Sequence, residues 1–301
     1  MPSKIIQWFP GHMAKTRRMM AECLPLVDAV IEILDARIPR SSQNPEIDKI
    51  CGDKPRLVLL SKSTLANPTI TSQWKQYFEN KERGCIICDF VTGAGMNEIV
   101  PELQRLCADT LERYAAKGMH GKALRAMVVG IPNVGKSSFI NKITGAKKAR
   151  VEDRPGVTVD KQWVKTPYRL ELLDMPGVLW PKFEEKTVAE NLAITGAIKD
   201  QILDVEELAC VLCSRLAATD PDAFFSRYGL PDTLREGYDG YDLLEAVGRK
   251  RGFLIKGGDV NTERTALMLL DELRGGKIGR ISLEKPRFKP QPTCSEDTSS
   301  L

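Results

Sequence analysis

The feature that most constrains this chain is the stretch Gly130-Ile-Pro-Asn-Val-Gly135-Lys136-Ser137, which matches the pattern GxxxxGK(S/T). An apolar run of strand type precedes it at residues 124–129, and a helical pattern starts at Ser138. A strand, a glycine loop and a helix N-terminus bring several backbone N–H groups and the positive end of a helix to one anion. The alternative, an ordinary glycine-rich turn, has no use for the lysine and the serine. The sequence therefore predicts a phosphate loop that binds a nucleotide.

The residue types of this loop have separate tasks in holding a triphosphate. Gly130 and Gly135 allow the tight backbone path, and the Lys136 side chain can reach the outer phosphates. The Ser137 hydroxyl can ligate Mg²⁺. The other loop residues expected to contact the nucleotide are Asn133, Val134 and Ser138.

The order of elements along the chain indicates an α/β fold. Runs of strand type occur at residues 26–34, 56–60, 85–88, 124–129, 162–165 and 169–173, and helical patterns separate most of them, one running from Asn97 to about residue 117. Such alternation predicts a mostly parallel sheet with helices on both faces, and ligands then bind at the carboxyl ends of the strands. The phosphate loop, Asp35, residues 61–64 and residues 174–177 would all lie on that one rim.

From residue 183 the pattern is helical only, with helices expected at 187–198, 204–217, 221–228, 240–250 and 261–274. Asn261 is placed to cap the last helix, and Gly275 and Gly276 are placed to end it. We therefore expect a nucleotide-binding domain at 1–182, a small all-helical domain at 183–289 and a disordered tail at 290–301.

Charge is unevenly spread along the chain. Residues 1–21 carry four basic groups and no acidic one, and residues 249–289 carry eleven basic and five acidic groups, while the whole chain has a net charge of +4. Two basic poles on an acidic body suggest a polyanionic partner such as RNA, with plain solvated faces as the alternative. The residues expected to bind RNA phosphates are Arg249, Lys250, Arg251, Lys277 and Arg280, followed by Arg17 and Arg18.

The composition gives no support for a membrane or secreted protein. No apolar run reaches the length of about 18 residues that a membrane span needs, and the N-terminus lacks the apolar core of a secretory signal. Eight cysteines in such a chain are expected to be reduced thiols. The CxxC pairs Cys85/Cys88 and Cys210/Cys213 leave a zinc site open, but their apolar surroundings are typical of buried cysteines.

A second motif, Asp174-Met-Pro-Gly177, follows a strand downstream of the phosphate loop. In this arrangement Asp174 holds Mg²⁺ through water, and the Gly177 amide meets the γ-phosphate. Thr158, in Pro155-Gly-Val-Thr158, can close over the metal as a switch residue. DxxG alone is a weak signal, but the order and spacing of these elements make the combination specific.

The motifs together closely resemble the circularly permuted ribosome biogenesis GTPase A (YlqF-type) family. The resemblance runs from about residue 4 to 289 and includes Trp8-Phe-Pro-Gly-His-Met13, Asp35-Ala-Arg-Ile-Pro39, Gly248-Arg-Lys-Arg-Gly252 and Gly279-Arg-Ile-Ser-Leu-Glu284. It implies a circularly permuted P-loop GTPase, cytoplasmic, that uses GTP and Mg²⁺ and assists maturation of the large (50S) ribosomal subunit. The implied partners are that particle and its rRNA, with no membrane or DNA, and the particle would stimulate slow intrinsic hydrolysis.

The resemblance also suggests roles for two residues outside the main motifs. In similar GTPases an Asn at the position of Asn133 supports a K⁺ ion, although a plain loop residue is the alternative. Val178 follows Gly177 and cannot orient water, whereas His12's position has been suggested to do so from the N-terminal segment. The alternative is that His12 is a loop histidine bonded to backbone. The expected catalytic residues are therefore His12, Lys136, Thr158 and Gly177.

The base-reading segment departs from the family pattern. The usual Asn-Lys-x-Asp is replaced by Ser61-Lys62-Ser63-Thr64, so the amide that ties the segment to the phosphate loop and the carboxylate that reads guanine are both missing. Thr64 offers one neutral acceptor in place of a charge, which predicts a loss of guanine preference of about one to two powers of ten. If Asp89 pointed at the base, its carboxylate would repel guanine O6 and could accept from an adenine amino group.

These departures leave two other functions open beside a GTP switch. One is an NTPase on the same fold with relaxed choice between ATP and GTP. The other is a non-hydrolysing assembly scaffold that binds RNA, against which the unaltered phosphate loop and Asp174 argue.

Overall fold

The computed structural model describes residues 11–79, 83–145, 162–180, 183, 185–198, 200 and 204–287, with side chains described from residue 17 onward. The expectations for Thr158, for the side chain of His12 and for the tail at 290–301 concern positions outside these described residues.

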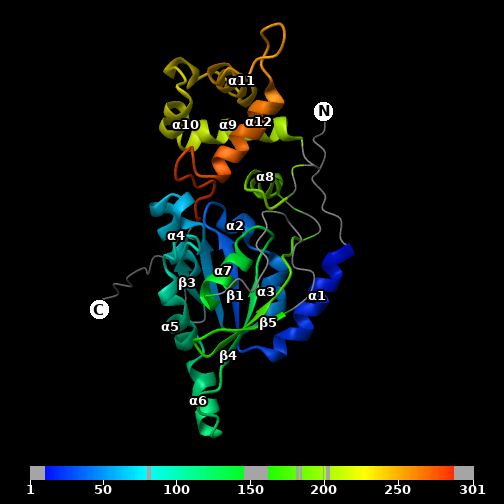
Figure 1. Cartoon of the computed structure of the whole chain (residues 1–301), viewed down its shortest axis with the longest axis vertical. Helices are drawn as coiled ribbons and strands as arrows, with labels where there is room; N and C mark the ends of the chain where they lie inside the picture. Colours follow the sequence, from blue (N-terminus) through cyan, green and yellow to red (C-terminus); the bar gives the residue numbers. More distant parts are fainter. Residues whose placement is uncertain are drawn as a thin grey trace, which may run out of the picture.

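Six strands form one sheet in the order β3-β2-β1-β4-β6-β5 (Figure 1). They are β1 (Ala29–Asp35), β2 (Arg56–Ser61), β3 (Arg83–Ile87), β4 (Leu124–Val129), β5 (Gln162–Lys165) and β6 (Leu170–Asp174). All neighbours pair in parallel except β5, which runs antiparallel to β6 at one edge. The phosphate-loop strand β4 lies near the centre of the sheet although three strands precede it in the chain. The expected fold class, a mostly parallel and circularly permuted α/β sheet, is confirmed.

Helices cover both faces of the sheet because the strands are apolar on both sides. All seven residues of β1 are buried, and alternate ones point to opposite faces. Ile31 and Ile33 pack in the cluster that contains residues of α5 (Met96–Leu106) and α7 (Lys136–Thr144). Val30 and Leu34 pack in the clusters on the other side, which involve α1 (Gly11–Cys23), α3 (Pro45–Cys51) and α4 (Pro68–Phe78).

Two local expectations were wrong. The long helix expected from Asn97 is divided into α5 and α6 (Ala108–Ala116) at Cys107, whose φ of −104° and ψ of 19° are not helical. The first strand starts three residues later than expected, because Leu24–Leu26 continues α1 as a 3-10 turn. Figure 1 shows α6 projecting from the end of the molecule that lies farthest from α11.

The described residues after 183 form helices and one isolated bridge, between Leu254 and Val260. The helices are α8 (Lys186–Ile194), α9 (Val205–Thr219), α10 (Pro221–Tyr228), α11 (Gly240–Arg251) and α12 (Thr262–Arg274). The Asn261 side chain accepts from the N–H of Arg264, so the expected cap of α12 is confirmed. The short helix α2 (Pro39–Ser42) contacts α8, so the helical part packs directly on the sheet part.

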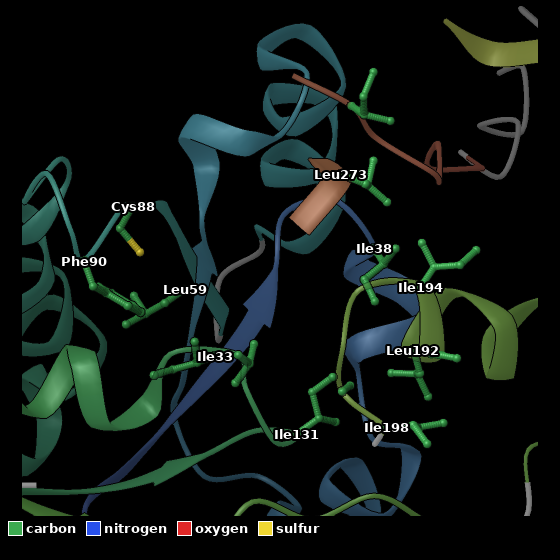
Figure 2. Close-up of a cluster of buried hydrophobic side chains, with 14 of the residues drawn as sticks. Ile33, Ile38, Leu59, Cys88, Phe90, Ile131, Leu192, Ile194, Ile198 and Leu273 are labelled. Carbon is green, nitrogen blue, oxygen red and sulfur yellow. The ribbon is translucent and has the colours of Figure 1, made fainter. Parts of the chain in front are cut away.

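One hydrophobic cluster runs through both parts of the molecule (Figure 2). Ile33 and Leu59 contribute to it from the strands, and Leu192, Ile194 and Leu273 contribute from the helices. The apolar core is continuous across residue 183. The division of the chain into two domains at this residue therefore stays a prediction. Within the part of the chain that the structure describes, no helix combines the length and the apolar character that a membrane crossing needs.

Candidate functional site

The expected rim forms at the carboxyl ends of the strands. In the parallel ladders Asp35 at the end of β1 is the partner of Ser61 at the end of β2, and Asp174 at the end of β6 is the partner of Val128. The phosphate loop leaves β4 two residues after Val128 and leads into α7 at Lys136. The structure thus brings together the phosphate loop, the base-reading turn and the Asp174 motif, as the sequence predicted.

The backbone of the phosphate loop requires its two glycines. Gly130 has φ 153° and Gly135 has φ 102°, which side chains of L-residues rarely allow. A Cβ atom on Gly130 would lie 2.6 Å from the carbonyl oxygen of Ile33, so the space is also closed. Asn133 has φ 57°, a left-handed value that asparagine tolerates better than most residues. These backbone angles give the loop the tight path that phosphate binding requires.

Lys136 is buried at the start of α7 and points back into the loop. Its Nζ atom donates to the carbonyl oxygens of Gly130 at 3.0 Å and Ile131 at 2.8 Å. Burial lowers the pKa of Lys136 to about 8, and the nearby Asp174 opposes that shift. Gly177 lies over this amine: a Cβ atom there would be 2.8 Å from Nζ. The cation and the glycine of the second motif therefore meet where the outer phosphates are expected.

Asp174 is buried, and its Oδ1 atom has no hydrogen-bond partner among the described residues. Burial raises the pKa of Asp174 to about 6, although Lys136 acts in the opposite direction. A buried oxygen with free lone pairs suits a hard cation, and Mg²⁺ is usually held by one or two carboxylates together with phosphates and water. Ser137 follows Lys136 in the first turn of α7 and is partly exposed. The residues present thus fit Mg²⁺.

Ser61 retains the link that its replacement of asparagine was expected to remove. Its Oγ atom lies 2.7 Å from the carbonyl oxygen of Val134 on the phosphate loop and 2.9 Å from that of Leu34. The expectation of a lost link was wrong because a hydroxyl can donate to the loop as an amide does. Lys62 follows with a left-handed φ of 55°, and its Nζ atom lies 3.1 Å from Asp35 Oδ2.

Thr64 and Asp89 form the end of the rim where the base is expected. The Thr64 hydroxyl donates to Asp89 Oδ2 across 2.5 Å, and Asp89 Oδ1 accepts from the N–H groups of Val91 and Thr92. These hydrogen bonds lower the pKa of Asp89 against the effect of its burial. The Asp89 carboxylate is therefore fixed on its own turn and on Thr64, rather than directed alone at the base.

Contacts between the rim and the helical part were not predicted from the sequence. Asn133 Nδ2 donates to the carbonyl oxygen of Gly196, which follows α8, across 2.8 Å. Arg280 Nε and Nη2 donate to the carbonyl oxygens of Ala66 and Ser63, each at 3.0 Å. The N–H of Ile281 also bonds the carbonyl of Leu65. The motif Gly279-Arg-Ile-Ser-Leu-Glu284 was the available signal, but it gave no indication of what it touches.

Comparisons with known proteins agree with this geometry. A family model described as a 50S ribosome-binding GTPase matches residues 125–223. The ribosome biogenesis GTPase A of Priestia megaterium is 46% identical over 95% of this chain and 99% of that protein. That of Bacillus cereus is 45% identical over 94% of each chain. The chain belongs to the ribosome biogenesis GTPase A family.

As a member of the ribosome biogenesis GTPase A family, the protein binds and hydrolyses GTP. A GDP-bound structure titled TM YlqF matches it with a TM-score of 0.63 at 25% identity, over 89% of this chain and 99% of that chain. A GNP-bound YlqF from Thermotoga maritima shares the fold, with a TM-score of 0.60 at 24% identity, over 90% of this chain and 98% of that chain. The resemblance inferred from the motifs is confirmed.

The basic residues expected on RNA lie at separate places on this GTPase. Arg17 and Arg18 are on α1 and pair with Glu46 and Glu22. Arg249, Lys250 and Arg251 end α11 and are all exposed, and Arg251 also lies near Glu272 and the ring of Tyr228. Lys277 follows α12 and is exposed. Arg280 is engaged with the base-reading turn, so it has a structural task besides any contact with RNA.

The paired cysteines lie within the apolar interior. Cys85 and Cys88 are buried in different hydrophobic clusters, and burial raises the pKa of both thiols. Cys213 is buried as well, and burial raises the pKa of Cys210 to about 11. Metal binding needs the thiolate form, which these surroundings disfavour.

Proposed function

We propose that this GTPase is a switch for maturation of the large (50S) ribosomal subunit, acting in the cytoplasm on that particle and its rRNA. The names of the family model and of the relatives support this choice of particle. The observation that carries the proposal is the joining of the nucleotide rim to the helical part. Asn133 bonds Gly196, and Arg280 bonds the base-reading turn. A rearrangement of the rim on hydrolysis therefore reaches the helices that carry Arg249 and Lys250.

The residues of the rim divide the chemistry among themselves. When bound, Mg²⁺ supplies neutralisation of charge on the outer phosphates. Ser137 and Thr158 would hold it directly and Asp174 through water. The Lys136 ammonium would exchange its hydrogen bonds to two carbonyl oxygens for bonds to phosphate oxygens. The negative charge of the phosphate would then offset the desolvation of this buried cation. The Gly177 N–H would sense the γ-phosphate.

Two catalytic assignments complete the proposal. His12 would orient the attacking water, because Val178 has no polar group for that task. A K⁺ ion beside Asn133 would add positive charge near the phosphates. Both are tested by hydrolysis assays: full turnover by His12→Ala removes His12 from the mechanism, and equal rates in KCl and NaCl remove the K⁺ ion.

The proposed partner is rRNA, held through phosphates by Arg249, Lys250, Arg251 and Lys277, with Arg17, Arg18 and Arg280 contributing where their internal partners allow. We propose neither DNA nor a membrane as a partner. The side chains at the end of α11 are the best placed, because Arg249 and Lys250 are exposed to solvent and can reach phosphates, although Arg249 also lies near Glu245.

Phosphate release from GTP, with and without large-subunit precursor particles, tests the function. We expect slow release from the isolated protein, acceleration of at least about tenfold by the particle, and loss of both with Lys136→Ala. Particles that bind the protein without changing its rate would contradict the switch. Absence of binding at low salt would contradict the choice of particle.

A further inference from the structure

The hydrogen bond from Thr64 to Asp89 fixes the direction of the Thr64 hydroxyl. Asp89 is 3% exposed and is held through Oδ1 by two backbone N–H groups, each 2.9 Å away, so its position does not depend on Thr64. Asp89 Oδ2 receives the hydroxyl proton across 2.5 Å. Thr64 itself is exposed. Because the single proton of the hydroxyl is taken, Thr64 presents only lone pairs to a ligand.

This hydroxyl belongs to a turn that packs against the phosphate loop, where the base of a bound nucleotide is expected. Ser61, three residues before Thr64, contacts the phosphate loop through the carbonyl of Val134. Phe90, next to Asp89, packs under the same loop: a Cβ atom on Gly135 would lie 3.0 Å from its ring. The N–H of Ser63 also bonds the carbonyl of Cys88, which joins the two turns. The pair is therefore part of the nucleotide rim.

The edges of the two purines respond differently to a group that only accepts. Guanine presents two neighbouring donors, N1–H and the 2-amino group, and a hydroxyl oxygen has two lone pairs for them. Adenine presents an acceptor at N1 and no donor at position 2, so two acceptors would face each other. The negative charge behind the hydroxyl strengthens its acceptor character, as in other charge-assisted networks.

We propose that Asp89 fixes the Thr64 hydroxyl as an acceptor for guanine N1–H and the 2-amino group, so that the pair selects guanine without a carboxylate at position 64. Thr64 touches the base, and Asp89 is a positioning residue. The proposal rests on the proposed GTP-dependent function and names the residues that make it specific for guanine. It reverses the expectation that Thr64 and Asp89 relax base choice.

Asp89→Asn is the sharpest variant. Its Oδ1 atom can still accept from the Val91 and Thr92 N–H groups, while its amide places a donor opposite Thr64. The hydroxyl then accepts from that amide and turns its proton toward the base. We expect the preference for GTP over ATP, measured as the ratio of Kd values by calorimetry with Mg²⁺, to fall by about tenfold or more, with tighter ATP binding contributing. If Asp89 only stabilised the turn, Asp89→Asn would change the Kd values for GTP and ATP by the same factor.

Thr64→Val removes the hydroxyl and keeps the shape of the side chain. We expect weaker GTP binding by about tenfold, with ITP, which lacks the 2-amino group, affected less and ATP within about threefold. The exchange Thr64→Asp with Asp89→Ser restores a carboxylate and hydroxyl pair, so it should return the wild-type preference. Thermal unfolding of each variant shows whether it folds, and the ratio within one variant is independent of its active fraction.

The outcomes separate this inference from the proposed function. A wild-type ratio retained in both Asp89→Asn and Thr64→Val overturns the inference, as does equal binding of GTP and ATP by the wild type. Neither result affects the phosphate loop. Failure of the wild type to bind any nucleoside triphosphate would instead contradict the GTP-dependent function. Selective GTP binding without stimulation by ribosomal particles leaves the inference standing and contradicts only the partner.

A different surface supports a second inference at the opposite end of the sheet. Residues 113–125 contain four basic residues and no acidic one. A cavity of about 220 Å³ lies there, with Leu103, Leu124 and Leu170 in its lining. Tyr168, 54% exposed, and Lys122 also line it, and Lys122 Nζ lies 3.9 Å from the ring centre of Tyr114. Two carboxylates of this region already have partners: Asp28 accepts from the Tyr114 hydroxyl, and Glu171 accepts from Arg125.

We infer that this cavity receives an unpaired nucleotide of single-stranded RNA. The leucine side chains in its mixed lining and the exposed Tyr168 ring suit the face of a base, and Lys122 and Arg169 suit the flanking phosphates. The position at the amino ends of β4 and β6 makes this contact separate from the nucleotide rim, so RNA could be held at both ends of the molecule (Figure 1).

Fluorescence titration of the full chain with a short RNA that carries 2-aminopurine tests the cavity. We expect a change in emission on binding, and affinity about fivefold or more weaker with Tyr168→Ala, whereas Tyr168→Phe keeps the wild-type value. Lys122→Ala should weaken binding, and Lys49→Ala, on the remote helix α3, should not. Wild-type affinity in Tyr168→Ala, or equal competition by an acidic peptide, overturns the inference.

Discussion

The side-chain amide of Asn133 on the phosphate loop donates a hydrogen bond of 2.8 Å to the carbonyl oxygen of Gly196, beyond the end of α8. Arg274 on α12 holds the same region through the carbonyls of Ala193 and Ile194, each at 3.0 Å. The phosphate loop therefore meets a segment that α12 has already fixed. This contact gives the first of four predictions.

Asn133→Asp should loosen the segment that follows α8. The variant places a carboxylate against the Gly196 carbonyl, and two facing acceptors at this partly buried contact should cost about 1 kcal/mol. Amide hydrogen exchange at residues 193–198 should become faster. Asn133→Gly tolerates the left-handed φ and removes the bond without repulsion, so it should show a smaller effect. Unchanged exchange in the Asp variant would show that the contact does not hold the segment.

Asp174→Asn should stabilise the nucleotide-free protein while it weakens Mg²⁺-dependent GTP binding. The pKa of Asp174 is raised to about 6 in the folded protein, so ionisation of this carboxyl destabilises the fold as pH rises from about 4 through 6. Above that window the variant should gain about 1–3 kcal/mol in unfolding free energy, and below about pH 4 the gain should vanish. Urea unfolding at several pH values measures it. A gain that is equal at all pH values would contradict the burial argument.

Lys250→Ala should reduce RNA affinity without changing stability. Lys250 is exposed at the end of α11, and each phosphate contact adds about 0.7–0.9 to the slope of log affinity against log salt. We expect the slope to fall by about that amount, with an unchanged melting temperature. Arg280→Ala is the useful contrast, because losing its bonds to the base-reading turn should lower the melting temperature even without RNA. An unchanged salt slope in Lys250→Ala would remove Lys250 from the RNA contact.

Glu284→Ala should destabilise the fold by at least about 2 kcal/mol. The carboxylate of Glu284 accepts from the backbone N–H groups of Arg40 and Ser41 and from the side chain of Asn191, so its removal leaves the donors of the buried residues Ser41 and Asn191 unpaired. Burial raises the pKa of Glu284, which shows that these bonds only partly offset its desolvation. Glu284→Gln keeps one acceptor and should cost less. Equal denaturation midpoints for the wild type and the Ala variant would contradict this role.

The positions of the rim residues could be predicted from the sequence because the elements that form the rim adjoin one another along the chain. A strand, a glycine loop and a helix start adjoin one another at residues 124–144, and parallel strands must bring their carboxyl ends to one edge. The division of the long helix at Cys107 had no comparable signal, because the apolar spacing continues on both sides of it. Hydrophobic period alone does not report a local change of backbone angle.

The contacts that join the two parts of the chain could not be derived from pattern. Glu284 meets Ser41 across 243 positions, and Arg280 meets Ser63 across 217. Basic residues near the C-terminus were assigned to RNA because charge clusters are visible in sequence, whereas their internal partners are not. Ser61 illustrates the opposite error: a change of residue type suggested a lost bond that the hydroxyl in fact makes.

The backbone bonds from Ile281 to Leu65 and from Leu283 to Arg37 bear on how the protein is made. During synthesis the base-reading turn and the phosphate loop are made well before residues 281–283, whose backbone bonds complete the outer side of that turn. Contacts of such large sequence separation form late in folding. A nascent chain stalled before α12 would therefore display an unfinished purine site, because residues 281 and 283 supply bonds to its outer side.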